Sequence, residues 1–551
     1  MTRAQKLRLA VSLSAMAVLA AGTSFWVHAQ STDARPVPSL LPPGALIYLE
    51  AKDFGSLLTE WNNSAEKKRW LTGANYRVMS LSRLVQRLSQ AQDEFAALAG
   101  LPVGMNLADQ AAGTRSGFAF YNLSALSFVY ITQMPASRVE TTSLWRSRAR
   151  YQSREVAGIP FYVKSNEAGA RTIAFTSYKD WFVISTDEDR MAATLVLLSG
   201  AQAASLATES WFVEALKQSA AQGDLRLVYN LRTLLSTPQF RTYWIQRNAS
   251  ELKPFASGIS DLFQRPDGFE EQRAMLRISE SPVRESDASL SQALAYAPPA
   301  ASLYRAWSMP DPRTLSEVLQ QVVAGERPPR DVYNAPAPEV TPEAGAVGSE
   351  ADLEIRIDEA PFQRSSESSI TPLSDALLAM QPVALLHVQN TVVLRDQVFV
   401  TPSSAAVVIC KQPDRAALDR ALAQTSALQT GDLDPLRVSV NGRAVILARM
   451  NLPGMDLPRS TAALSLPPDA TYAAVYNHLA EWGDYKKLFA VIDTHAANPE
   501  MMVSSSVPPF FSGDLKSLGE TLSRLRSASI LSADPGGETV DETVRYRFTA
   551  P

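Results

Sequence analysis

The chain has 551 residues, of which 46% are hydrophobic and 20% are charged. This length exceeds one ordinary hydrophobic core, so two or more domains are expected, and the apolar share excludes general disorder. The formal net charge of −4 at pH 7 excludes a broadly basic nucleic-acid binder, and we expect no nucleic-acid partner.

Residues 1–29 have the pattern of an export signal. A basic start precedes an apolar run over 9–21, and a small residue stands at the cleavage position. We therefore predict a signal peptide that is cleaved between Ala29 and Gln30, which makes the mature protein periplasmic or secreted. The alternative is an uncleaved inner-membrane anchor, because residues 9–27 could just span a bilayer. The chain would then touch a membrane only through this segment.

Cys410 is the only cysteine, so no intramolecular disulfide can form. It ends the apolar run 405–410, where the simplest interpretation is a small hydrophobic core residue. An exported chain without disulfides depends on its hydrophobic cores, which again favours large domains.

In chain order, the first half alternates strands with helices. Residues 30–40 predict a short tether, and Asp53 can cap the helix after the first strand. Thr186 and Asp189 stand at capping-box spacing, and more helix is expected over 230–263. Apolar or alternating runs predict strands over 45–50, 117–121, 126–132, 159–163, 172–176, 181–185, 225–229 and 274–278.

Several stretches of the second half match stretches of the first half in the same order. The pairs are 42–43 with 298–299, 128–135 with 406–413, 156–163 with 440–447, and 228–230 with 475–477. Each match alone is weak, but their common order predicts an internal duplication. We expect a first repeat over 41–285 and a second over 286–551, in which the hairpin and helix at 172–200 have no counterpart.

Residues 325–371 are rich in proline and acidic side chains and include a serine cluster. Such a stretch cannot bury enough apolar surface to offset the entropy lost on ordering. We therefore predict a disordered insertion inside the second repeat.

No catalytic, cofactor-binding or metal-binding pattern stands out. The chain has no Gly-x-Ser-x-Gly, His-Glu-x-x-His or Walker sequence. Ser64 and Lys67 match Ser-x-x-Lys, but the partner motifs of that enzyme class are missing. Among the few histidines, His387 is interpreted as a buried strand residue and His478 as a surface or capping residue at a helix start.

Two charged clusters have simple interpretations. The acids at 187–189 could suggest a cation site, but acidic residues also suit the first turn of a helix. Trp145 and Tyr151 could stack on nucleic-acid bases while four neighbouring arginines contact phosphates. In an acidic chain, a solvent-exposed helix end is the simpler interpretation of these arginines. These arginines are Arg146, Arg148, Arg150 and Arg154.

The strand start Leu41-Pro42-Pro43-Gly44-Ala45 and the strand-to-helix step Trp-Phe-Val-Ile-Ser-Thr-Asp at 181–187 resemble a family of bacterial exported proteins. That family is known only as a domain of unknown function. The resemblance implies a periplasmic or secreted α+β protein, and it brings no catalytic residues.

Together these patterns predict an α+β fold made of two related domains, each a largely antiparallel or mixed sheet with helices packed on it. For function we expect a non-enzymatic binding or scaffolding protein, whose partner is another envelope protein or a second copy of itself. One alternative is a carrier of a hydrophobic or lipidic ligand. A second is a hydrolase that uses unrecognised carboxylates. No cofactor is expected.

Overall fold

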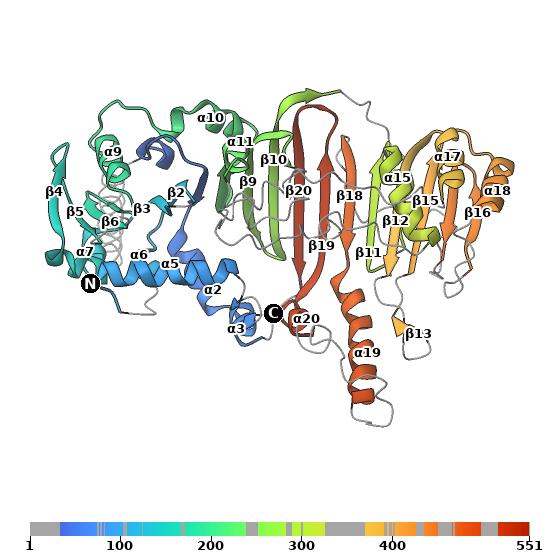
Figure 1. Cartoon of the computed structure of the whole chain (residues 1–551), viewed down its shortest axis with the longest axis horizontal. Helices are drawn as coiled ribbons and strands as arrows, with labels where there is room; N and C mark the ends of the chain where they lie inside the picture. The colour runs from blue at the N-terminus through green and yellow to red at the C-terminus, as the bar shows by residue number, and fades with distance from the viewer. Residues whose placement is uncertain are drawn as a thin grey trace, which may run out of the picture. The chain divides into compact units, whose positions relative to one another are not determined.

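A computed structural model describes most of the chain (Figure 1). The chain divides into two compact units: Met1–Thr59 with Gln90–Ser210, and Glu60–Ser89 with Trp211–Pro551. The described residues are 34–73, 76–77, 80–81, 83–102, 107–123, 125–166, 171–237, 252–282, 289–298, 301–324, 370–390, 394–395, 399–400, 403–425, 435–449, 466, 469–496 and 516–549. The predicted cleavage site at Ala29 and Gln30 lies outside them, as does nearly all of the predicted insertion at 325–371.

The first unit contains an antiparallel sheet with the strand order β1-β2-β3-β7-β6-β5-β4. Its strands are β1 (Ile47–Ala51), β2 (Ser116–Asn122), β3 (Ser127–Gln133), β4 (Gln152–Val156), β5 (Ile159–Ser165), β6 (Thr172–Tyr178) and β7 (Trp181–Ser185). Its helical segments are η1 (Val37–Leu40), α6 (Leu107–Ala111), α7 (Ala136–Val139), α8 (Ser143–Arg146), η2 (Arg148–Arg150), α9 (Glu188–Leu198) and η3 (Leu206–Thr208), with parts of α2 (Phe54–Asn63) and α5 (Arg83–Ala99).

Helices cover both faces of this sheet where β7 lies. All five residues of β7 are buried. Phe182 and Ile184 belong to a core with residues of α5, α6 and α8, whereas α9 packs beside β6 and β7 through buried side chains such as Leu195. A run of four consecutive apolar residues, Trp181 to Ile184, is the pattern expected of a strand covered on both faces.

The Pro42-Pro43-Gly44 strand start is held by three side chains. The Tyr121 hydroxyl donates to the carbonyl of Pro42 at 2.9 Å, and the Arg190 guanidinium donates to that of Pro43 at 2.8 Å. The backbone N–H of Gly44 donates to Glu209 at 3.1 Å, and Gly44 has a φ of 93°, which favours glycine. This motif therefore fixes how the chain enters β1, and its role is structural.

The second unit contains a longer antiparallel sheet with the order β8-β9-β10-β20-β19-β18-β11-β12-β15-β17-β16. Its strands are β8 (Leu225–Tyr229), β9 (Phe255–Arg265), β10 (Gly268–Ser281), β11 (Leu303–Ser308), β12 (Pro382–Asn390), β15 (Ser403–Cys410), β16 (Arg437–Asn441), β17 (Ala444–Ala448), β18 (Ala470–Tyr476), β19 (Leu525–Ala533) and β20 (Gly537–Phe548). The short strands β13 (Leu394–Arg395) and β14 (Phe399–Val400) pair separately.

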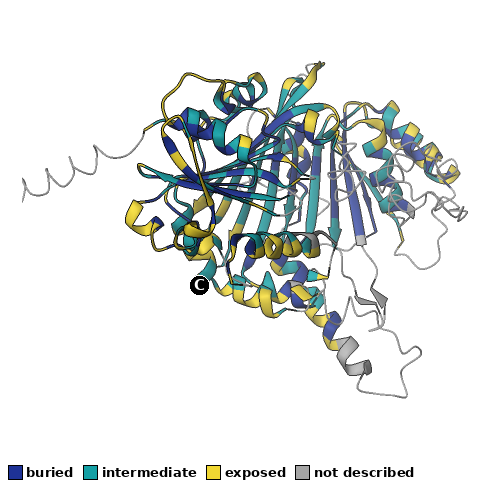
Figure 2. Cartoon of the chain, turned by 60° about the vertical axis from the view of Figure 1, so that its left-hand side comes forward, coloured by how far each residue is buried: buried dark blue, intermediate teal, exposed yellow. Residues whose placement is uncertain are grey.

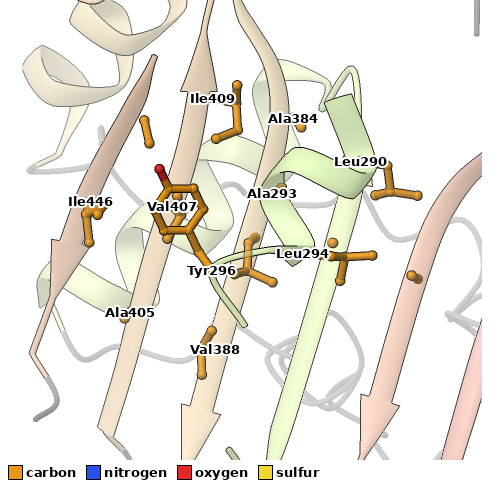
Figure 3. Packing of buried hydrophobic residues seen from close by; sticks show 14 of the residues in the cluster. Leu290, Ala293, Leu294, Tyr296, Ala384, Val388, Ala405, Val407, Ile409 and Ile446 are labelled. Atoms are coloured by element: carbon orange, nitrogen blue, oxygen red, sulfur yellow. The ribbon is translucent and has the colours of Figure 1, made fainter. Parts of the chain in front are cut away.

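Helices cover the β12-β15-β17 end of this sheet on both faces. On one face, Leu290, Leu294 and Tyr296 of α14 and the turn after it pack on alternate residues of β12, β15 and β17 (Figure 3). On the other face, α15, η4, α17 and α18 pack on the remaining alternate residues, among them Cys410. The described helical segments of this unit are α3 (Ala65–Thr72), α10 (Ser210–Lys217), α11 (Leu231–Leu234), α14 (Ser289–Leu294), α15 (Pro312–Leu319), η4 (Gln320–Ala324), α17 (Thr371–Ala379), α18 (Arg415–Gln424), α19 (His478–Ala496) and α20 (Lys516–Thr521), with the remaining parts of α2 and α5.

The α+β class and antiparallel sheets are confirmed, but the prediction of helix up to Phe263 was wrong. Residues 255–265 form β9, which pairs with both β8 and β10. Apolar side chains at 255, 259, 262 and 263 have helical spacing, and pairing with two neighbouring strands overrides that local pattern.

The predicted capping box at Thr186 and Asp189 was also wrong. The N-cap of α9 is Asp187, whose carboxylate accepts from the backbone N–H of Arg190 at 3.1 Å. The Thr186 hydroxyl instead donates to the carbonyl of Leu126 at 2.6 Å. Thr186 is therefore engaged with the neighbouring strand, which leaves the capping position to the next residue.

Candidate functional site

The middle strands of the second unit's sheet are only partly covered. Ala274 is the one buried residue among the described positions of β10, and Val544 is the one in β20. Figure 2 shows these strands largely in the colour of intermediate burial. Charged residues recur along both strands, which is unusual for strands at the centre of a large sheet. The middle of this sheet is therefore a polar surface.

One face of these strands carries a row of polar and aromatic side chains. Residues directly opposite each other on paired strands share a face, as do residues two positions apart on one strand. The registers place eight such residues on the same face, which we call the central stripe. The central stripe consists of Ser260, Glu271, Arg273, Glu542, Tyr472, Trp307, Arg305 and His387.

At one end of the central stripe, Arg273 joins two carboxylates. Its guanidinium makes two hydrogen bonds of 2.7 Å to Glu271 and one of 2.7 Å to Glu542, and Ser260 donates to Glu271 at 2.6 Å. Burial alone would raise the pKa of Glu271, but the hydrogen bonds from Arg273 and Ser260 outweigh it and lower that pKa below its usual value. Glu271 is therefore ionised at neutral pH.

At the other end, a cation lies among aromatic rings. The Arg305 guanidinium is 5.5 Å from the centroid of the Trp307 ring, and Trp307 and Tyr472 are 5.5 Å apart. An Arg305 N–H also donates to Nδ1 of His387 at 3.0 Å. Burial raises the pKa of Tyr472, so its hydroxyl keeps its proton. This end offers a positive charge, two large aromatic surfaces and hydroxyl and imidazole groups.

His387 is confirmed as a buried strand residue, with 1% of its surface exposed. Burial, together with the charge of Arg305, lowers its pKa to about 3. The imidazole is thus neutral at every physiological pH. Because Arg305 can only donate, Nδ1 must accept, and the ring proton lies on Nε2.

The prediction of a surface or capping role for His478 was wrong. His478 is buried, with 3% exposed, and its ring stacks on Trp482 at 6.1 Å. Asn477 caps α19 instead, since its amide oxygen accepts from the backbone N–H of Ala480 at 3.2 Å. The rings of Tyr476 and Trp482 flank the imidazole, and Trp482 in turn packs against Tyr485 and Phe489. The helical spacing of Trp482, Tyr485 and Phe489 in the sequence could have indicated this burial.

The remaining residues considered from the sequence are structural or solvated. Ser64 caps α3 by accepting from the N–H of Lys67 at 3.1 Å, so its hydroxyl has a capping role. The acids at 187–189 lie at the cap and first turn of α9, and Cys410 is buried in the core. The four arginines near Trp145 are exposed. Sequence reasoning missed the central stripe, for which the only local indication is charge on alternate positions of β10.

Among the described residues, no group of His, Cys, Asp and Glu side chains is arranged to hold a metal ion. Within the same part of the chain, no helix is long and apolar enough to cross a membrane.

No protein-family model matches the chain, and no curated protein matches it. Among solved structures, crystal form I of TP0453 matches with a TM-score of 0.24 and 13% identity, covering 45% of this chain and 80% of TP0453. Crystal form III matches with a TM-score of 0.24 and 11% identity, covering 49% and 89%. The similarity of this chain to TP0453 is therefore distant. At these scores the similarity carries no argument about function.

Proposed function

We propose that this protein is a non-enzymatic binding protein that holds another protein of the cell envelope against the central stripe. The observation that carries this proposal is a row of half-exposed ion pairs and aromatic rings across strands that are hydrogen-bonded into one sheet. A sheet holds such groups in fixed positions, so little ordering entropy is lost when a partner binds.

The composition of the central stripe supports a protein partner. Arginine, tyrosine and tryptophan are the residue types that dominate the binding energy of protein interfaces, and Arg305, Tyr472 and Trp307 lie side by side. The ion pairs of Arg273 add a polar region beside this aromatic centre, which is the usual layout of an interface.

The same geometry argues against the two alternatives. A hydrolase that uses a carboxyl group as general acid or base needs one that can give up and regain a proton near neutral pH. In the central stripe, the hydrogen bonds from Arg273 lower the pKa of Glu271, and Arg273 also donates a hydrogen bond to Glu542. A carrier of a lipidic ligand needs an apolar lining. The side chains on the half-exposed part of this face are ion pairs, a guanidinium and polar-tipped aromatics.

We also propose that the two halves of the chain arose by duplication, as matching strand orders support. The block β1-β2-β3-β7-β6-β5-β4 corresponds to β11-β12-β15-β17-β16 without two strands, and β8-β9-β10 corresponds to β18-β19-β20. Asn230 and Asn477, which match in sequence, each end a strand and cap the next helix. Gly158 and Gly442 each have a positive φ in a hairpin turn.

In the second unit, the order β8-β9-β10-β20-β19-β18 reads the same from either end under this correspondence. Such an order is what a two-fold axis between β10 and β20 would produce, as in a symmetric dimer fused into one chain. The central stripe crosses this axis.

The location in the envelope rests on the export pattern at 1–29 and on the resemblance to exported bacterial proteins, both of which come from the sequence. Mass spectrometry of the protein recovered from its native host tests cleavage between Ala29 and Gln30. Recovery with the first 29 residues attached would favour the inner-membrane anchor instead.

The binding proposal is tested by in vivo crosslinking and pull-down from envelope extracts. We expect a partner that is recovered with the wild-type protein, lost with the double variant Arg305→Ala/Tyr472→Ala, and retained with Arg547→Ala. Arg547 is a matched control because it lies on β20 with its side chain on the opposite face and 58% exposed. Sedimentation velocity tests whether the partner is a second copy of the chain. Recovery that is unchanged by the double variant, or no specific partner of either kind, would overturn the proposal.

A further inference from the structure

His387 carries a buried hydrogen-bond donor that has no acceptor among the described residues. Its Nδ1 accepts from Arg305, so the proton lies on Nε2, and Nε2 is buried and makes no hydrogen bond to the described part of the chain. A buried donor without a partner costs about 1–3 kcal/mol. A hydrophobic residue at this strand position would avoid that cost.

A positive charge and a small apolar residue lie on the two strands beside His387. Arg305 lies on the strand paired with that of His387, directly opposite it, and stacks on Trp307, which limits the directions its guanidinium can take. On β15, the other strand paired with β12, the residue opposite His387 is Ala406, which is small and apolar. The imidazole therefore has a positive charge on its Nδ1 side and a neutral N–H at Nε2.

We propose that this end of the central stripe binds a carboxylate group, which accepts from Nε2–H of His387 and is attracted by the Arg305 guanidinium. A carboxylate is the acceptor that fits, because it has two oxygens with only lone pairs and carries the charge that complements arginine. The inference rests on the proposed function in one respect, since an acidic side chain of the partner protein would supply the group. A free small carboxylate would have the same chemistry, and the experiment separates the two.

The experiment is ¹⁵N NMR of the full chain labelled at histidine, which is readable because the sequence has four histidines. The probes are acetate, the N-acetyl α-amide of glutamate, and the N-acetyl α-amide of glutamine, which has the same shape as the glutamate probe without a carboxylate. We expect a saturable shift of the Nε2 resonance of His387 with the glutamate probe, with an affinity of about 1–10 mM, and none with the glutamine probe. A preference for acetate over the glutamate probe would indicate a small carboxylate as ligand.

Variants connect the shift to this site. Arg305→Gln should weaken the response at least about tenfold through loss of the positive charge, and His478→Phe, which changes a second buried histidine, should leave it unchanged. His387→Phe should abolish partner capture if an acidic side chain is held there; if that variant does not fold, the wild-type titration and Arg305→Gln decide. No shift with either carboxylate up to about 50 mM, or an equal shift with the glutamine probe, would overturn the inference. Partner capture that still depends on Tyr472 would then leave the proposed function standing.

Discussion

His387 and Cys410 lie on neighbouring strands, β12 and β15, and burial holds each side chain in its neutral form. For the imidazole, burial and the charge of Arg305 lower the pKa, whereas for the thiol burial raises the pKa to about 12. The same physical cause therefore shifts the two groups in opposite directions, because one is charged when protonated and the other when deprotonated. Each shift leads to a measurable property.

His387 should make the fold less stable in mild acid. The unfolded chain takes up a proton on this imidazole as the pH falls below its ordinary pKa of 6.5, whereas the folded protein does so only near pH 3. Stability therefore falls between pH 6.5 and pH 3, by at most about 1.4 kcal/mol per pH unit. Urea unfolding at pH 7.5, 6.0 and 5.0 should show that His387→Phe reduces this slope. Gln389→Leu on the same strand titrates no group and should leave the slope unchanged; equal slopes in wild type and His387→Phe would contradict the prediction.

Cys410 should react with thiol reagents only when the protein unfolds. Its side chain has no exposed surface, and the thiolate that such reagents require is scarce at a pKa of about 12. Reaction with Ellman's reagent should be complete in denaturant and negligible over the same time in buffer, which makes this single thiol a reporter of global unfolding. Rapid reaction of the native protein at pH 8 would show that β15 opens without global unfolding.

At the scale of single elements, helix caps account for much of the local order. Asp414 accepts from the backbone N–H of Ala417 at 3.0 Å at the start of α18, and α18 packs Leu418 into the core. Asp414→Ala should therefore lower the free energy of unfolding by about 1 kcal/mol. Asp419→Ala on the same helix removes an exposed pair with Arg415 and should cost less than about 0.5 kcal/mol. Equal losses in the two variants, measured by urea unfolding, would show that the cap contributes nothing beyond a surface charge.

The strands and helices also show which parts of the fold can be predicted from the sequence. The hairpin of β6 and β7 was predictable because alternating apolar runs flank a short polar turn, and Asp53 was predictable as a cap. β9 was not, because its apolar residues have helical spacing, and only pairing with β8 and β10 decides its conformation. The missed elements are those whose neighbours along the sheet supply the decisive hydrogen bonds.

At the scale of the whole molecule, the central stripe could not be found from the sequence because its members come from six strands. Ser260 and Glu542 are 282 positions apart, yet both bond to the group centred on Arg273. No pattern within a short window brings them together. The order of matching segments predicts a duplication, but the antiparallel pairing of β10 with β20, which creates the stripe, follows only from the sheet register.

Arg273 links β10 to β20 through its ion pair with Glu542, and Arg273→Met should reverse the local response of stability to pH. Without the guanidinium, Glu271 and Glu542 face each other half-buried, so the variant should be destabilised at pH 7 on the order of 2 kcal/mol. Repulsion then raises the folded pKa of the two carboxyls above the unfolded value, so the variant gains stability as the pH falls from 7 toward 5. In the wild type, Glu271 has a lowered pKa, and its contribution to stability is kept until the pH falls below the ordinary pKa of 4.5.

Urea unfolding across this range should show the stability difference between wild type and variant shrinking with acid, and Glu271→Gln/Arg273→Met should recover most of it at pH 7. Arg547→Ala, an exposed change on β20, should cost less than about 0.5 kcal/mol at every pH. A constant deficit for Arg273→Met would mean that the lost packing of its side chain, and not the two carboxylates, accounts for the lost stability.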